Sequence, residues 1–80
     1  MNIGVIGLGL IGGSIAKAIR QTGEHRVFGM DIQRSVVDRA LLLDSINEEL
    51  SDERLKECDL VIIALYPGET IRFFKEKGNL

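Results

Sequence analysis

Residues 7–14 have the sequence Gly7-Leu8-Gly9-Leu10-Ile11-Gly12-Gly13-Ser14, and they follow directly on the apolar run Ile3-Gly4-Val5-Ile6. The apolar run is typical of a buried parallel strand, and the residues after the glycines have the apolar spacing of a helix. Between a strand and a helix, and with an acidic residue about 20 positions further on, such glycines are typical of a dinucleotide-binding βαβ unit. That acidic residue is Asp31, nineteen positions after Gly12. The sequence therefore predicts a dinucleotide-binding domain.

The size and composition of the chain fit one small soluble domain. It has 80 residues, 45% of them hydrophobic, which is too apolar for a disordered chain. The net charge of −2 provides no basic patch, so nucleic acid is not an expected partner. The apolar runs are shorter than the roughly 20 residues of a membrane span, and Met1 leads into a strand without a signal peptide. We therefore expect a cytoplasmic protein without a membrane partner.

Strand and helix patterns alternate along the whole chain. The first helix has Ile11, Ile15, Ala18 and Ile19 at the spacing of one face and ends at Gly23, a typical C′ glycine. The second opens on the capping-box pattern Ser35-Val36-Val37-Asp38. We expect it to bury Val37, Ala40 and Leu41. Two more helices are expected, one from the N-cap pattern Ser51-Asp52-Glu53 to about Cys58 and one over 69–77; strands are expected at 2–6, 26–31, 45–47 and 59–65.

This order of elements predicts an α/β fold with right-handed crossovers and a parallel sheet of strand order 3-2-1-4. It corresponds to the N-terminal half of a Rossmann-type doubly wound sheet, so residues 1–80 are expected to form a partial, truncated dinucleotide-binding domain. The fourth strand would then lie at an open edge. Exposed apolar edges favour pairing with another chain, and we expect self-association through residues 60–65.

Each glycine of the loop has its own expected role in binding a cofactor. Gly7 permits the tight turn out of the strand, Gly9 lets a pyrophosphate approach the backbone, and Gly12 lets the helix pack close to the sheet. The N–H groups of Leu10 and Ile11 lie at the helix N-terminus, which favours an anion. Ser14 is explained equally well as a phosphate donor or as an ordinary residue of the first helical turn.

Asp31 indicates which dinucleotide is bound. A carboxylate at the end of the second strand can accept hydrogen bonds from the adenosine ribose, and it repels the 2′-phosphate of NADP. We therefore expect NAD as the cofactor. Arg34 keeps NADP open as the less favoured alternative, because an arginine there can accommodate that phosphate. Leu65 and Tyr66 end the fourth strand at the same edge of the sheet, where they would either wall the cofactor or merely form a turn.

No catalytic or metal-binding constellation is evident in the chain. His25 lies in a polar loop away from the expected cofactor edge, and Cys58 has no metal-spaced partner and cannot form an internal disulfide. The acidic residues between 48 and 57 are expected to form a solvated face and helix-start charges rather than a metal site. The prediction is no catalytic residue and no metal ligand in this chain.

With these residues placed, the chain resembles the prephenate/arogenate dehydrogenase family of tyrosine biosynthesis. The matching segments are the loop from Gly7 to Ser14, Gly29-Met30-Asp31 at the end of the second strand, and the run from Asp59 to Pro67, where Leu65-Tyr66 departs from the more usual valine. The resemblance implies NAD-dependent oxidative decarboxylation of prephenate to 4-hydroxyphenylpyruvate, or the equivalent reaction of arogenate. It also implies that the catalytic histidine, the substrate-binding arginine and the helical dimer domain lie outside these 80 residues. We therefore expect a homo-oligomeric parent enzyme and an inactive isolated chain.

Other functions of the same fold stay open at this point. One alternative is another NAD(P)-dependent dehydrogenase or reductase, such as a hydroxyacid or imine reductase. Another is a non-catalytic nucleotide-sensing module, as in potassium-transport subunits, although those modules commonly carry a charged residue in a loop that here holds apolar Leu8, Leu10 and Ile11. A third is a truncation product that folds but binds weakly. The choice between prephenate and arogenate is not decided by this sequence.

Overall fold

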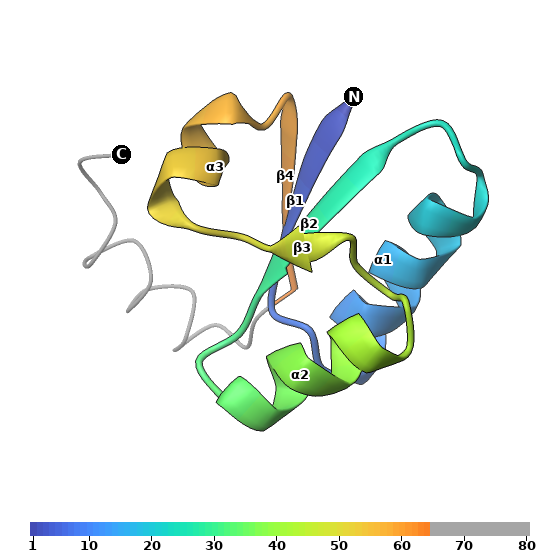
Figure 1. Cartoon of the computed structure of the whole chain (residues 1–80), viewed down its shortest axis with the longest axis vertical. Helices are drawn as coiled ribbons and strands as arrows, with labels where there is room; N and C mark the ends of the chain where they lie inside the picture. Colours follow the sequence, from blue (N-terminus) through green and yellow to red (C-terminus); the bar gives the residue numbers. More distant parts are fainter. Residues whose placement is uncertain (65–80) are drawn as a thin grey trace.

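Four parallel strands form one sheet in the order β3-β2-β1-β4, which confirms the predicted topology (Figure 1). The computed structural model of the chain describes residues 1–64. The expected residues of the last helix and the end of the fourth strand, 65–80, lie outside the described residues. The strands are β1 (Asn2–Ile6), β2 (Arg26–Met30), β3 (Glu48–Glu49) and β4 (Leu60–Ile63), and the helices are α1 (Leu10–Gln21), α2 (Arg34–Leu42) and α3 (Asp52–Glu57).

The helices cover the two faces of the sheet, with α1 and α2 on one side and α3 on the other (Figure 1). Alternate residues of β1 serve the two layers: Ile3 and Val5 pack toward α1 and α2, whereas Ile6 packs toward α3 with Phe28. Because β1 is buried on both faces, its sequence is almost continuously apolar, as expected of a central parallel strand. No helix among residues 1–64 is long and apolar enough to span a membrane.

The carboxyl ends of the three longer strands lie level with one another. Ile6 of β1 is in register with Met30 of β2 and with Ile63 of β4. The Gly7 N–H continues the pairing by donating to the Met30 carbonyl at 2.8 Å, and the Ala64 N–H donates to the Ile6 carbonyl at 2.8 Å. The loops that follow β1 and β2 therefore meet at one edge of the sheet.

The predicted third strand at 45–47 is wrong in position, because β3 comprises Glu48–Glu49. Ile46 is apolar because its side chain is buried in the core under α1 and α2, and it does not belong to a strand. Asn47 does bond to β2, but partly through its side chain: its Oδ1 accepts from the Val27 N–H at 2.8 Å. A side-chain acceptor thus replaces the backbone carbonyl that a regular strand would offer.

The predicted capping box at Ser35 is also wrong. Helix α2 begins at Arg34, its N-cap is Gln33, and no side chain caps it. The Gln33 carbonyl accepts hydrogen bonds from the N–H groups of Val36 and Val37. The Gln33 N–H is itself bonded to the Asp31 carboxylate at 3.0 Å, so the turn after β2 starts the helix two residues earlier than a Ser35 cap would.

The buried stripe of α1 differs from the face expected from its isoleucines. Gly12 and Ala16 are buried, whereas Ile11 is 71% exposed and Ala18 is exposed. Small residues are buried here because α1 approaches the sheet closely. The end of α1 is as predicted: Gly23 has φ +74° and its N–H donates to the Arg20 carbonyl.

Two other local predictions are confirmed. The Ser51 side chain accepts a hydrogen bond from the Arg54 N–H at 3.2 Å and so caps α3, whose first turn carries Asp52 and Glu53. Val37 and Ala40 of α2 are buried, and Leu41 is partly buried against the same core.

Strand β4 leaves apolar side chains partly exposed: Leu60, Val61 and Ile63 are 36–46% exposed. Self-association through this edge stays a prediction.

Candidate functional site

The glycine loop leaves β1 at the edge where the strands end and leads directly into α1. Gly7 has φ +91°, a backbone conformation that favours glycine, and it turns the chain out of the sheet. A Cβ on Gly12 would overlap the Gly7 carbonyl oxygen and would lie 3.2 Å from the Ala64 Cβ. The roles predicted for these two glycines, the tight turn and the close packing of α1, therefore match their surroundings in the structure.

The N-terminus of α1 is open above Gly9. Gly9 is the N-cap residue and its helix has no side-chain cap; among the described residues, a Cβ on Gly9 would meet no atom beyond its chain neighbours within 4 Å. The Gly13 N–H donates to the Gly9 carbonyl at 2.8 Å, so the N–H groups of Leu10 and Ile11 precede the first hydrogen bond of the helix. Unpaired N–H groups and the helix dipole together favour an anion at this point.

Asp31 joins the glycine loop to the start of α2. Its Oδ2 accepts a hydrogen bond from the Leu8 N–H at 2.8 Å, and its Oδ1 accepts one from the Gln33 N–H at 3.0 Å. Each carboxylate oxygen can accept a second hydrogen bond, so the group retains acceptor capacity for a ligand. The residue predicted to contact the cofactor thus also fixes the loop that would hold it.

Leu8 is a site residue that the sequence pattern did not single out. Its side chain is only 5% exposed and covers Gly29, where a Cβ would approach the Leu8 methyl groups to 2.8–2.9 Å. The loop is therefore held from two sides, by the Leu8 side chain in the core and by the Leu8 N–H on Asp31. The sequence signal that could have indicated a buried Leu8 is its apolar side chain between two glycines of the loop.

Arg34, the first residue of α2, is held by two carboxylates. Its Nη1 lies 2.6 and 2.7 Å from the two oxygens of Glu49, and its Nε and Nη2 lie 3.0 and 2.8 Å from Oδ1 of Asp38. The hydrogen bond to Glu49 and then that to Asp38 raise the pKa of the Arg34 guanidinium above its ordinary value. Glu49 was expected only to belong to a solvated acidic face, and its partner is 15 residues away in sequence.

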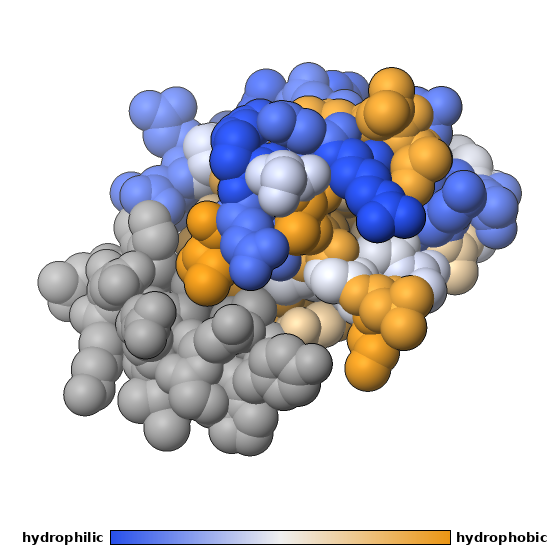
Figure 2. Space-filling view, turned by 90° about the horizontal axis from the view of Figure 1, so that it is seen from below, coloured by the Kyte–Doolittle hydropathy of each residue, from blue (hydrophilic) through white to orange (hydrophobic). Residues whose placement is uncertain are grey.

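Figure 2 views the edge of the molecule at which the strands end, with apolar side chains exposed among hydrophilic ones. The exposed apolar residues at this edge include Leu10 and Ile11 in the first turn of α1 and Ile32 after β2, which are 71–90% exposed. Beside the glycine loop, an open groove of about 510 Å³ runs between α1 and α2. Leu8, Gly9 and Leu10 form its end nearest the loop, and Lys17 and Arg39 line it further along.

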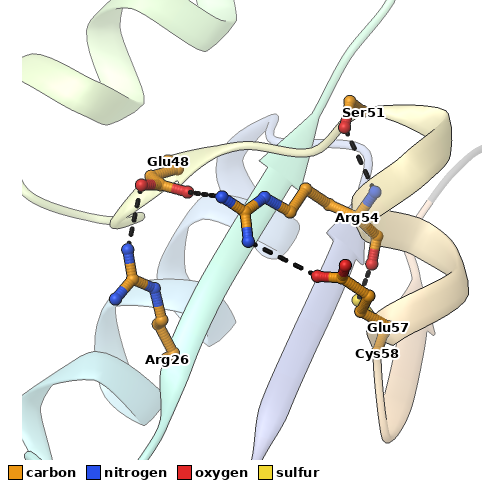
Figure 3. A network of polar contacts seen from close by, with 6 residues as sticks. All are labelled: Arg26, Glu48, Ser51, Arg54, Glu57 and Cys58. Carbon is orange, nitrogen blue, oxygen red and sulfur yellow. Dashed lines mark hydrogen bonds and ion pairs between the residues drawn. The ribbon is translucent and has the colours of Figure 1, made fainter.

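Four charged residues of β2, β3 and α3 form a separate network on the α3 side of the sheet (Figure 3). Glu48 pairs with Arg26 at 2.9 Å and with Arg54 at 3.7 Å, and Arg54 also contacts Glu57 at 3.4 Å. Both guanidinium groups lie over the Phe28 ring, 5.7 and 5.6 Å from its centroid. This network fastens α3 to the sheet, and no group of three or more metal-ligating side chains occurs among residues 1–64.

The other candidates from the sequence lie away from the loop edge or serve the fold. The His25 Nδ1 is 3.2 Å from the N-terminal amine of Met1, at the opposite edge of the sheet. The Cys58 thiol donates to the Arg54 carbonyl at 3.3 Å, and burial raises its pKa. The Ser14 hydroxyl donates to the Leu10 carbonyl at 2.7 Å, which is the ordinary helical interpretation. Leu65 and Tyr66 lie outside the described residues.

Taken together, the described edge offers an anion site and a hydroxyl-binding carboxylate in one place. The open helix N-terminus suits a phosphate group, and Asp31 at the adjacent strand end suits a sugar hydroxyl. A dinucleotide contains both groups. The groups at this edge therefore fit such a cofactor.

Comparison with known proteins gives the same result. Residues 2–79 match the family model described as the NAD binding domain of 6-phosphogluconate dehydrogenase. The fold is similar to the crystal structure of Synechocystis arogenate dehydrogenase, with a TM-score of 0.85 and 27% sequence identity. That match covers 96% of this chain and 28% of the other, so the chain spans less than a third of the length of that dehydrogenase. The resemblance expected from the sequence is confirmed at the level of the cofactor-binding domain.

Proposed function

The chain belongs to the family of NAD binding domains named for 6-phosphogluconate dehydrogenase, and from this we propose that it binds NAD for a dehydrogenase acting on prephenate or arogenate. The substrate class is taken from the resemblance of the glycine loop and from the similarity to an arogenate dehydrogenase. Bound NAD would supply the hydride acceptor. The chain itself would bind and orient that cofactor.

One observation carries the proposal: Asp31 is bonded to the Leu8 N–H at the foot of the open helix N-terminus. Because of this bond, the carboxylate after β2 lies beside the glycine loop that leads to the N–H groups of Leu10 and Ile11. A dinucleotide would place its pyrophosphate at these N–H groups and its adenosine ribose at Asp31. Gly9 leaves the space for that approach, since even a Cβ added to it would meet no atom of residues 1–64 within 4 Å apart from its chain neighbours.

The charge at this edge favours NAD over NADP. Asp31 lies where a 2′-phosphate would enter, and a carboxylate repels that dianion. Arg34, the residue that could attract the phosphate, is already paired with Glu49 and Asp38. We therefore propose NAD as the physiological cofactor.

The proposal assigns no chemical step to this chain. His25 is the one histidine of the sequence, and it lies at the opposite edge of the sheet from the glycine loop. The acid–base and substrate-binding residues of the reaction would come from the part of such an enzyme that this chain does not cover. The isolated chain is accordingly expected to bind NAD and not to reduce it in the presence of prephenate or arogenate.

A chimera tests the proposal at the level of activity. The chain would replace the matching segment of an arogenate dehydrogenase, and NADH formation with arogenate would be followed by absorbance. The proposal is supported if the first chimera is active and a second chimera carrying Asp31→Ala is not. Circular dichroism must show that both chimeras are folded. A folded chimera that binds no NAD would contradict it.

A second candidate function is favoured by the family description. Its named dehydrogenase acts on 6-phosphogluconate, so a dehydrogenase for another hydroxyacid shares the same cofactor-binding domain. The two candidates predict the same NAD site and differ only in the substrate. Assays of an enzyme that contains this chain, with arogenate, prephenate and 6-phosphogluconate as alternative substrates, would distinguish them.

A further inference from the structure

The guanidinium of Arg34 is paired with two carboxylates in the described structure. Glu49 reaches across from β3 and places both of its oxygens within 2.7 Å of Nη1. Asp38, one turn along α2, contacts the other two nitrogens, Nε and Nη2, at 3.0 and 2.8 Å. Each of the three guanidinium nitrogens therefore has a carboxylate partner among the described residues, which leaves at most the second N–H of Nη2 for a ligand.

The position of Arg34 gives this pairing a functional meaning. It begins the helix that follows Asp31, and Gln33, its neighbour in sequence, is bonded to the Asp31 carboxylate. In dinucleotide-binding domains an arginine near this carboxylate is what accommodates the 2′-phosphate of NADP. Arg34 therefore has the sequence position of an NADP-binding residue, but its charge is already neutralised.

We infer that Glu49, assisted by Asp38, is a specificity-determining residue that disfavours NADP by keeping Arg34 from the 2′-phosphate. This inference rests on the proposed function, since it concerns the same cofactor site. For Arg34 to give its whole charge to the 2′-phosphate, its contacts with Glu49 would have to break. While they persist, NADP brings a dianion toward an edge that holds three carboxylates and one guanidinium. NAD has no 2′-phosphate, so its binding does not require the Arg34 contacts to change.

The neighbouring residue Glu48 provides a matched control. It differs from Glu49 by one position and carries the same charge, but it pairs with Arg26 and Arg54 in the network of Figure 3. Both residues are partly exposed, with side-chain exposures of 41% and 44%. Glu48→Gln therefore changes the net charge as Glu49→Gln does and leaves Arg34 paired.

The experiment measures the dissociation constants of NAD and NADP for the 80-residue chain by titration calorimetry at low ionic strength. Glu49→Gln is expected to tighten NADP binding by about fivefold, the scale of one exposed ion pair, and to change NAD binding by less than about twofold. Adding Asp38→Asn should increase the gain, and adding Arg34→Ala to Glu49→Gln should abolish it. Glu48→Gln should leave the NADP-to-NAD ratio as in the unmodified chain.

The outcomes separate this inference from the proposed function. If the unmodified chain binds neither dinucleotide, the proposed function fails and the inference fails with it. If the chain binds NAD but Glu49→Gln leaves the ratio unchanged, or Glu48→Gln raises it equally, the inference alone is overturned. Circular dichroism spectra of all variants establish that each one is folded, since the substituted ion pairs are exposed and contribute little to stability.

Discussion

The carboxylate of Asp31 accepts a hydrogen bond from the backbone N–H of Leu8 at 2.8 Å, and this bond joins the end of β2 to the glycine loop after β1. The second carboxylate oxygen holds the Gln33 N–H and so begins α2. One acidic side chain therefore positions both loops of the cofactor edge. A single substitution of Asp31 removes both its role in the fold and its proposed role in binding. The first is measured as a loss of stability and the second as a loss of NAD affinity.

Substituting Asp31→Ala should lower the free energy of unfolding by about 1–2 kcal/mol, because two backbone N–H groups lose a charged acceptor. Urea unfolding followed by circular dichroism measures this loss. Asp38→Ala is the matched control, since it removes an exposed ion pair with Arg34 and should cost about 0–1 kcal/mol. Equal effects of the two substitutions would show that the Asp31 hydrogen bonds do not stabilise the loops.

Two glycines of the loop should separate folding from binding. Gly12→Ala would place a Cβ on the Gly7 carbonyl oxygen, so we expect a loss of about 3 kcal/mol in stability or failure to fold. A Cβ on Gly9 would meet no atom of the described residues within 4 Å apart from its chain neighbours, and Gly9 has φ −65°, so Gly9→Ala should cost about 1 kcal/mol or less.

The same Gly9→Ala variant should nevertheless bind NAD at least about tenfold more weakly, because its methyl group enters the space for the pyrophosphate. Urea unfolding and NAD titration of both variants provide the two readouts. A Gly9→Ala protein that is stable and binds NAD normally would argue against a pyrophosphate above Gly9.

A comparison of two serines tests where the helices begin. Ser51→Ala should destabilise the protein by about 1 kcal/mol, since the Ser51 side chain caps α3 through the Arg54 N–H. Ser35→Ala should change stability by less than about 0.5 kcal/mol, because Ser35 lies inside α2 and makes no cap. Thermal or urea unfolding of both variants is sufficient, and the reverse order of the two effects would contradict the helix boundaries.

The fold was largely predictable because its signals are local. The apolar run of β1, the Gly23 terminus of α1 and the Ser51 cap each depend on a few neighbouring residues. The strand order then follows from the alternation of strands and helices with right-handed crossovers. Likewise, the turn at Gly7 and the close packing of α1 against the sheet at Gly12 could be expected from the spacing of the glycines alone.

The sequence-based predictions were wrong where a residue far away in the sequence determines the local structure. Helix α2 starts before Ser35 because Asp31 fixes the Gln33 N–H, and Ile46 is apolar because it packs under two helices rather than in a strand. The pairing of Arg34 with Glu49 spans 15 residues and depends on the position of β3. No spacing rule in the sequence connects these residues, so the role that we propose for them in cofactor choice could be inferred only from the structure.

Cys58 gives a pH dependence with a defined sign. Burial, followed by the charges of Asp59 and Glu57, raises the pKa of this thiol above the value of 9.0 for a free cysteine. A group whose pKa is raised on folding stabilises the folded state below its unfolded value, and this contribution is lost as the pH rises through the folded value. Stability should therefore fall between about pH 8 and about pH 10 more steeply in the native chain than in Cys58→Ala. The urea midpoints of both proteins at the two pH values measure the difference. An equal fall in stability with pH in both proteins would contradict the explanation by a partly buried thiol.

The central claim, that the glycine loop and Asp31 bind NAD, is tested most directly by an NMR titration of the ¹⁵N-labelled chain with NAD. We predict saturable shifts of the amide signals of Leu8, Gly9, Leu10 and Ile11, with no change at His25 on the opposite edge. The same titration of Asp31→Ala should need a higher NAD concentration to reach the same shifts. Unchanged loop amides at about 1 mM NAD, a concentration that would reveal even weak binding, would contradict the claim.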